Sequence, residues 1–260
     1  MEIGPVKSKA PQIHFKQSKN AVLPSLPLRA MMLGNSGNGK TNLSSSLITD
    51  PRFYRGAFAK IYWFSPTARI DDSLEPVREY IEDNLVQNQS EDPSFYETLD
   101  TEALAKIISR AKGVMEYLKQ EKPRRKCAYN TLIVIDDLAD TVDHKAQLLI
   151  NQLFIKARHY GISTILSTQK LRLPLVTQAV RVNITALFVV GKLRNQSDLW
   201  DGIIYEYSAL VDKAKLLAAY KQATDIPYNF LYINLLAKNP NKMFFSGFGR
   251  SFIMNVDEQE

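Results

Sequence analysis

The segment 34–41 constrains the fold of this chain more than any other part of the sequence. It reads GNSGNGKT and matches the phosphate-binding loop pattern, a glycine, four residues and then Gly-Lys-Ser/Thr. Glycines allow backbone angles that a Cβ would block, so the loop N–H groups can turn inward and cradle the α- and β-phosphates of a nucleotide. Lys40 then reaches the β- and γ-phosphates, and the Thr41 hydroxyl can ligate Mg²⁺. The nucleotide-binding residues expected from this pattern are Gly34, Asn35, Ser36, Gly37, Asn38, Gly39, Lys40 and Thr41.

The sequence on either side of this loop fits the structure that such a loop requires. Residues 28–33 form a mostly apolar run, as expected for a buried parallel strand. Residues 42–48 follow, with Leu43, Leu47 and Ile48 on one face of a predicted helix. The N-terminus of that helix adds partial positive charge for phosphate. This order of strand, loop and helix predicts a nucleotide site rather than a chance turn.

A second run ends in paired carboxylates. Residues 131–135 are almost wholly apolar and lead into Asp136 and Asp137. A strand here would lift both acids to the carboxyl edge of the sheet, where ligands bind in open α/β folds. Asp136 would hold Mg²⁺ through its water shell or through Thr41, and Asp137 would orient or deprotonate an attacking water. The alternative for a lone acid at this position is a helix N-cap.

The second acid favours hydrolysis over transfer to a substrate hydroxyl, because water needs a base or an orienting group. Gln169 follows a further apolar strand at 163–168 and can approach the γ-phosphate if that strand neighbours the loop strand. The alternative is an ordinary polar residue at a strand end. The predicted catalytic set from these segments is Lys40, Asp137 and Gln169.

The rest of the chain alternates strands and helices. Strands are expected at 59–65, 185–190, 230–235 and 242–245, the last two as a hairpin, and helices at 75–85, 101–120, 144–159 and 208–223. This alternation predicts an α/β fold, a mostly parallel central sheet with helices on both faces and a C-terminal β extension. We expect one P-loop ATPase domain at residues 21–256, a flexible basic arm at 1–20 and an acidic tail at 257–260.

Composition limits the cellular setting and the partners. Cys127 is the one cysteine, so no internal disulfide is possible, which fits a reducing compartment. The sequence has neither a run of 18 apolar residues nor a signal-peptide core, so we expect a soluble protein without a transmembrane segment. The net charge is +6, with excess Lys and Arg in residues 1–20 and 119–126. A polyanion such as DNA would explain both clusters, and solvated surface would explain them equally well.

Further short segments occur in a particular order along the chain. Beyond the loop and the acid pair these are Ser-Pro-Thr at 65–67, RHYGIS at 158–163, Ser-Thr-Gln at 167–169, Arg-Val-Asn at 181–183 and Lys-Leu-Arg-Asn at 192–195. The series resembles the DNA-packaging ATPases of the FtsK–HerA superfamily, in particular those of poxviruses, other large DNA viruses, virophages and Polinton-like elements. The resemblance covers residues 28–235. Its most specific part is the RHYGIS segment leading to the strand that ends in Gln169.

The resemblance implies several properties that the residues alone do not. It implies a RecA-like sheet in which the Gln169 strand lies between the loop strand and the Asp136 strand, making Gln169 a γ-phosphate sensor. It implies a homo-oligomeric ring, a pentamer or hexamer, in which an arginine of one subunit completes the ATP site of its neighbour. Arg158 and Arg181 are the favoured catalytic candidates, and Arg194 is a third. Many motor ATPases carry glutamate where this chain has Asp137, although paired aspartates occur in the viral branch.

The expected function is therefore an ATP- and Mg²⁺-dependent motor that translocates double-stranded viral DNA into a preformed capsid. Its expected location is the virion or the viral assembly site in the host cytoplasm, with a capsid vertex or an inner membrane component as docking partner. Two alternatives remain at this point. One is a helicase or conjugation-type DNA pump on the same fold, and the other is a nucleotide-dependent assembly protein with little turnover.

Overall fold

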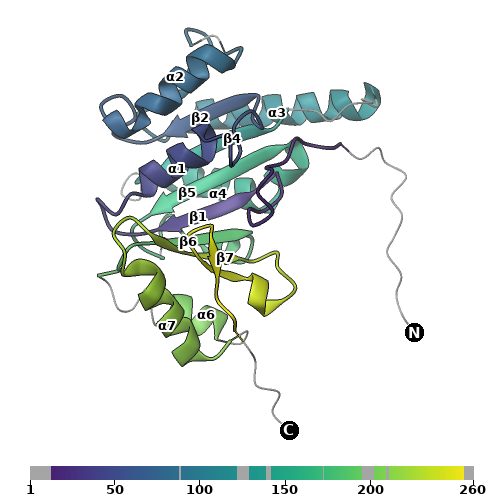
Figure 1. Cartoon of the computed structure of the whole chain (residues 1–260). Helices are drawn as coiled ribbons and strands as arrows, with labels where there is room; N and C mark the ends of the chain where they lie inside the picture. The colour runs from purple at the N-terminus through teal and green to yellow at the C-terminus, as the bar shows by residue number, and fades with distance from the viewer. Residues whose placement is uncertain are drawn as a thin grey trace, which may run out of the picture.

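The computed structural model describes residues 13–87, 89–121, 129–138, 142–171, 173–194, 202–208 and 211–254. Three predicted features lie partly or wholly outside these residues: the first part of the basic arm, most of the basic cluster at 119–126, and the acidic tail at 257–260. Within the described chain, nine strands form one sheet in the order β3-β2-β4-β5-β1-β6-β7-β8-β9. Helices cover both of its faces (Figure 1). This confirms the predicted fold class.

The centre of the sheet consists of parallel strands with apolar side chains on both faces. Neighbouring strands pair in parallel from β2 through β4, β5 and β1 to β6. Almost every side chain in them is buried, which explains why these segments read as continuous apolar runs rather than alternating ones. Their bounds are β1 Arg29–Leu33, β2 Lys60–Phe64, β4 Thr131–Asp136, β5 Ile162–Thr168 and β6 Ala186–Val190.

Short strands extend the sheet at both edges. β7 (Phe230–Asn234) pairs antiparallel with β6, and β8 (Phe244–Ser246) pairs antiparallel with β7, which confirms the predicted C-terminal hairpin. The second strand of the hairpin begins two residues later than expected. β9 (Arg250–Ser251) ends this edge. At the other edge, β3 (Phe95–Tyr96) pairs with β2 in a segment for which the sequence predicts no strand.

Two apolar layers join the helices to the sheet. α1 (Lys40–Thr49) and α2 (Glu75–Asn84) pack on one face. α3 (Thr101–Glu121), α4 (His144–Ile155) and α7 (Lys213–Thr224) belong to the layer on the other face. Successive strand residues alternate between the layers, so that Met31 and Leu33 face one and Ala30 and Met32 face the other. The sheet thus lies between helices, as Figure 1 shows.

Several helix boundaries differ from the sequence-based expectation. The helix predicted at 144–159 ends at Ile155, and a 3₁₀ turn (Ala157–Tyr160) follows. Gly161 then reverses the chain with φ 67°, a left-handed angle that few residues other than glycine adopt. The helix predicted from 208 begins at Lys213, where the Asp212 side chain caps it. Short elements that were not predicted are α5 Gln178–Arg181, α6 Tyr205–Tyr207 and the 3₁₀ turns Asp72–Leu74 and Pro240–Lys242.

The described part of the predicted arm lies against the body of the protein. Ile13 and Phe15 pack on Met115 and Leu118 of α3. The Gln17 side chain hydrogen-bonds the backbone of Leu26 through both its oxygen and its nitrogen. Residues 13–20 therefore depart from the flexible arm expected there, because two apolar side chains in this otherwise polar segment find a helix face to cover.

Candidate active site

The predicted phosphate-binding loop connects β1 to α1 at the carboxyl edge of the parallel strands. Its entry is tight, because a Cβ on Gly34 would stand 2.5 Å from the carbonyl oxygen of Val190. Gly37 and Gly39 have φ angles of 78° and 92°, which side chains other than glycine rarely allow. The three glycines of the motif thus serve one close approach and two left-handed turns, as the sequence pattern predicts.

Two asparagine side chains hold the loop against the end of β6. Asn35 Nδ2 donates to the carbonyl oxygen of Lys192 at 2.7 Å, and Asn38 Nδ2 donates to that of Val190 at 2.8 Å. The Asn38 side chain also lies so close to Gly191 that a Cβ there would stand 2.6 Å from Nδ2. The sequence motif assigns these positions to phosphate binding through their N–H groups. The structure adds a second role for them as anchors of the loop.

Lys40 is a buried cation at the start of α1. Its Nζ donates to the carbonyl oxygens of Gly34 at 2.9 Å and Asn35 at 3.1 Å. Burial lowers the pKa of Lys40, and the charges of Asp137 and Asp136 oppose that shift. An ammonium group has three donors, so a phosphate oxygen at the loop can still be reached.

The loop and the second carboxylate segment meet across 95 residues of sequence: Thr41 Oγ1 donates to Asp136 Oδ2 at 3.1 Å. The Asp136 side chain is buried, and this burial raises its pKa, while the hydrogen bond from Thr41 and the charge of Lys40 act the other way. A hydroxyl and a buried carboxylate are the hard oxygen ligands that suit Mg²⁺. No cluster of three or more His, Cys, Asp or Glu occurs among the described residues.

Asp137 and Gln169 form a direct side-chain pair. Gln169 Nε2 lies 2.9 Å from Asp137 Oδ1 and 2.8 Å from Oδ2. β5, which ends just before Gln169, lies between β1 and β4, so the strand order implied by the resemblance is confirmed. Asp137 has φ 54°, an angle that costs energy for a residue with a side chain. Strain of this kind is concentrated at functional sites, and here it turns an exposed carboxylate toward the amide of Gln169.

The loop and the acid pair border a cavity of about 510 Å³, whereas Gln169 reaches it only through its contact with Asp137. Ser36, Lys40, Thr41 and both aspartates line it. Residues that no sequence motif predicts also line it, among them Asp71, Ser73 and Tyr228. Asp71 accepts a hydrogen bond from the Ser73 N–H at the start of a 3₁₀ turn, an N-cap pattern that was readable in the sequence. Tyr228 carried no such signal, because only the fold brings its turn to the loop.

The predicted arginines lie outside this cavity. Arg158 belongs to the 3₁₀ turn that precedes β5, and Arg181 ends the short helix α5 that precedes β6. Both therefore lie near the amino ends of parallel strands, whereas the loop lies at the carboxyl ends. Arg194 follows β6 on the loop side, where its side chain is exposed. Within one chain, neither Arg158 nor Arg181 contacts the site, so a catalytic role for them remains a prediction about a neighbouring subunit.

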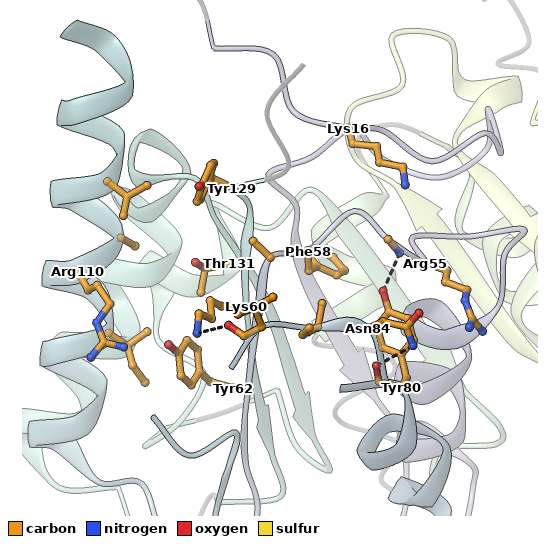
Figure 2. A pocket seen from close by; sticks show the side chains of 17 residues that line it. Lys16, Arg55, Phe58, Lys60, Tyr62, Tyr80, Asn84, Arg110, Tyr129 and Thr131 are labelled. Atoms are coloured by element: carbon orange, nitrogen blue, oxygen red, sulfur yellow. Dashed lines mark hydrogen bonds between the residues drawn. The ribbon is translucent and has the colours of Figure 1, made fainter. Parts of the chain in front are cut away.

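A larger cavity, of about 900 Å³, lies elsewhere, between α2, α3 and the amino end of β2. Figure 2 shows Lys60, Arg110 and Tyr62 gathered on one side of it. These three groups bind Asp92, with Lys60 at 3.1 Å and Arg110 at 2.7 Å. Burial raises the pKa of Asp92, but the hydrogen bonds from these groups hold it below the usual value. None of the predicted site residues lines this cavity, so its size does not make it the nucleotide site.

The described helices include none with the length and apolarity needed to cross a membrane.

Solved structures with a similar fold include nucleotide-dependent transport proteins. The pCW3 conjugation coupling protein TcpA, solved with ATPγS, is 13% identical with a TM-score of 0.54, covering 82% of this chain and 59% of that chain. The cytoplasmic domain of the type VII secretion ATPase EccC of Thermomonospora curvata is 15% identical with a TM-score of 0.50, covering 99% and 28%. At such identities these similarities establish the fold alone. This chain thus spans less than two thirds of either neighbour.

The genome packaging NTPase B204 of Sulfolobus turreted icosahedral virus 2 also matches, with AMPPCP bound. It is 16% identical, with coverage of 82% of this chain and 95% of that chain and a TM-score of 0.49. The search of curated proteins finds no match.

The comparison with protein families is more specific than the comparison of folds. The model of the family described as "Poxvirus A32 protein" matches residues 13–225, which is most of the chain. The match contains the loop, the acid pair, Gln169 and the arginines at 158 and 181, so it confirms the resemblance to the poxvirus type. The chain therefore belongs to the poxvirus A32 protein family.

Proposed function

We propose that this protein is an ATP-hydrolysing motor that moves double-stranded viral DNA into a preformed capsid. The observation that carries the proposal is the meeting of five side chains at one edge of the sheet, in a chain of the poxvirus A32 family. Lys40 and Thr41 come from the loop, Asp136 and Asp137 from the end of β4, and Gln169 from the end of β5. Hydrolysis of a nucleoside triphosphate needs each of these chemical types.

The loop and its helix would hold the triphosphate. Inward-facing N–H groups of the loop, together with the N-terminus of α1, favour phosphate oxygens at this position. Lys40 adds a positive charge that its buried position leaves poorly screened. Thr41 and Asp136 are the residues that would hold Mg²⁺, which when bound neutralises charge on the β- and γ-phosphates.

Asp137 and Gln169 would handle the attacking water. The Gln169 amide donates to both carboxylate oxygens of Asp137 and so fixes the orientation of that group. Each carboxylate oxygen has a further lone pair, which leaves Asp137 able to accept a hydrogen bond from water at the γ-phosphate. Gln169 would approach the same phosphate from the end of β5, so its contact with Asp137 is the element that would respond when the phosphate leaves.

The motor would act as a homo-oligomeric ring of five or six subunits, with Arg158 or Arg181 completing the site of the adjacent subunit. An arginine supplied in this way stabilises the charge of the transition state. Duplex DNA would be held through its phosphates, so its binding should be independent of sequence and weakened by salt. The net charge of +6 supports such a partner. The protein would act at the viral assembly site or in the virion, docked on a capsid vertex or an inner membrane component.

The direct test is ATP turnover with and without long duplex DNA, in the presence of Mg²⁺. We expect hydrolysis that DNA stimulates, and we expect Lys40→Ala to abolish it while the circular dichroism spectrum stays unchanged. Lys145→Ala serves as the control, because Lys145 is an exposed lysine of α4. Absence of hydrolysis by the folded wild-type protein in both conditions would overturn the enzyme assignment. Rings that form only with ATP but release almost no phosphate would favour an assembly protein instead.

A further inference from the structure

Tyr228 lies at the nucleotide cavity without a structural task that accounts for it. It lines the cavity together with Gly39 and Lys40, and its Cδ1 is 3.2 Å from the point where a Cβ on Gly39 would stand. Its side chain is 72% exposed. Within the described part of the chain, no hydrogen bond, ring contact or cation–π contact involves the Tyr228 side chain. A large aromatic ring thus lies beside the phosphate-binding loop and is exposed to solvent.

The backbone at Tyr228 is strained. Residues 226–229 form a tight turn, closed by a hydrogen bond of 3.2 Å from the Asn229 N–H to the carbonyl oxygen of Ile226. Pro227 occupies the second position of this turn, and Tyr228, with φ 61°, occupies the third. Glycine or asparagine is the usual residue at such a position, because a positive φ is unfavourable for a bulky side chain. The chain therefore retains a tyrosine where glycine would stabilise the turn.

The turn that carries Tyr228 and the phosphate-binding loop both contact the end of β6. The Gly191 N–H donates to the carbonyl oxygen of Asn229 at 3.1 Å, and Lys192 Nζ lies 2.8 Å from Asp225 Oδ1. The end of β6, at residues 190–192, is also where Asn35 and Asn38 anchor the loop. The position of the turn that carries Tyr228 is therefore fixed relative to the loop by contacts that both make with residues 190–192.

We propose that the ring of Tyr228 is the stacking platform for the base of the bound nucleotide. The inference rests on the proposed nucleotide site and assigns the part of the ligand that the loop does not hold. The loop and α1 would fix the phosphates, and the absence of a Cβ at Gly39 lets the edge of the ring approach the loop closely while the rest of the ring stays exposed. Every nucleobase has a π-face, so stacking on an exposed ring adds affinity without reading hydrogen-bonding groups. The predicted ligand class is a nucleoside triphosphate with modest base selectivity.

The test compares two ligands that differ in the base. A nonhydrolysable ATP analogue and inorganic tripolyphosphate are titrated by calorimetry, with Mg²⁺, into the wild type and into Tyr228→Gly. The loss of one stacked base corresponds to a reduction in affinity of roughly 5- to 150-fold for the ATP analogue. The affinity for tripolyphosphate should stay within about twofold of wild type, because tripolyphosphate has no base to stack. The melting temperature of Tyr228→Gly should not fall, since glycine relieves the positive φ.

Two further variants make the result specific to the ring. Tyr228→Phe keeps the ring and should restore the affinity for the ATP analogue, whereas a role of the hydroxyl would leave it weakened. Tyr205→Ala removes another exposed tyrosine, which does not line this cavity, and should change neither titration. If Tyr228→Gly lowers the affinity for both ligands equally, or lowers the affinity for neither, the stacking assignment is overturned. A wild-type protein that binds neither ligand would overturn the proposed nucleotide site itself.

Discussion

At the scale of single residues, Asp136 and Asp137 are neighbours in sequence but lie in opposite environments. Asp136 is buried and accepts a hydrogen bond from Thr41, whereas Asp137 is exposed and accepts a hydrogen bond from Gln169. This difference supports the roles proposed for them, Asp136 as a ligand for Mg²⁺ and Asp137 as a group that handles water. The sequence identified both residues and Gln169, because each follows a continuous apolar strand whose end is easy to locate. Tyr228 was not identified, since no local pattern connects residue 228 with residue 39.

Replacing Asp137 should block chemistry without blocking binding. We expect Asp137→Asn to lower ATP turnover by about 10²- to 10⁴-fold, the range for loss of a positioned group that handles a proton. Affinity for a nonhydrolysable ATP analogue should remain, because Asp137 lies beyond the loop that holds the phosphates. Asp83→Asn, at an exposed position in α2, is the control for a lost carboxylate. Wild-type turnover in Asp137→Asn would remove this residue from the mechanism.

Replacing Asp136 should remove the response to Mg²⁺. In wild type, we expect Mg²⁺ with an ATP analogue to raise the melting temperature above the value measured with a chelator, since a ligand that binds only the folded state stabilises it. Asp136→Asn should lose most of this rise. With chelator present, the variant should melt no lower than wild type, because burial disfavours the charged carboxylate. A full Mg²⁺ response in the variant would contradict the assigned metal site.

At the scale of elements, the strands and helices that bury continuous apolar faces were predicted. The short elements β3, α5 and α6 were not. β1, β4, β5 and β6 were readable because both faces of each are buried. β3 consists of two residues, and its place depends on a tertiary hydrogen bond from the Trp63 N–H to the carbonyl oxygen of Ser94. α5 has four residues, too few for a helical period to appear in the sequence.

Two glycines in different elements should respond oppositely to alanine. Gly113 lies within α3 with no atom near the position of a Cβ, so Gly113→Ala should stabilise the protein by about 0.5–1 kcal/mol through helix propensity. A Cβ on Gly34 would clash with the Val190 carbonyl oxygen, so Gly34→Ala should lower both the melting temperature and the affinity for ATP. Thermal denaturation with and without nucleotide measures both effects. Equal responses of the two variants would contradict the packing of the loop on β6.

At the scale of the whole molecule, the site residues and the two favoured arginine candidates lie toward opposite ends of the parallel strands. The loop, both aspartates and Gln169 are at the carboxyl ends, while Arg158 and Arg181 precede β5 and β6 at their amino ends. One subunit cannot bring the two ends together without unfolding the sheet. If these arginines act in hydrolysis, they act on the site of an adjacent copy, and a ring would bring the two copies together. The sequence of one chain indicates such a contact only through its resemblance to ring-forming ATPases.

Mixing two inactive variants tests this arrangement. The Arg158→Ala protein and the Arg181→Ala protein are each mixed with the Lys40→Ala protein. ATP turnover is measured over a range of ratios of the two proteins in each mixture. Removal of an arginine that acts between subunits should lower ATP turnover of the pure variant by about 10³- to 10⁵-fold. Mixing should then restore part of the turnover, because an intact loop of one copy meets an intact arginine of another. Failure of both pairs to complement, despite mixed oligomers by mass spectrometry, would assign the arginines to other roles.

In the proposed function, ATP hydrolysis moves this protein along duplex DNA. It is tested most directly by displacement of a third strand bound to a linear duplex, monitored by fluorescence, with a forked duplex alongside to report strand separation. We expect ATP and Mg²⁺ to drive loss of the third strand while the forked duplex stays paired, and we expect Lys40→Ala to displace no third strand. Separation of the forked duplex would indicate a helicase. ATP turnover without displacement of the third strand would contradict translocation.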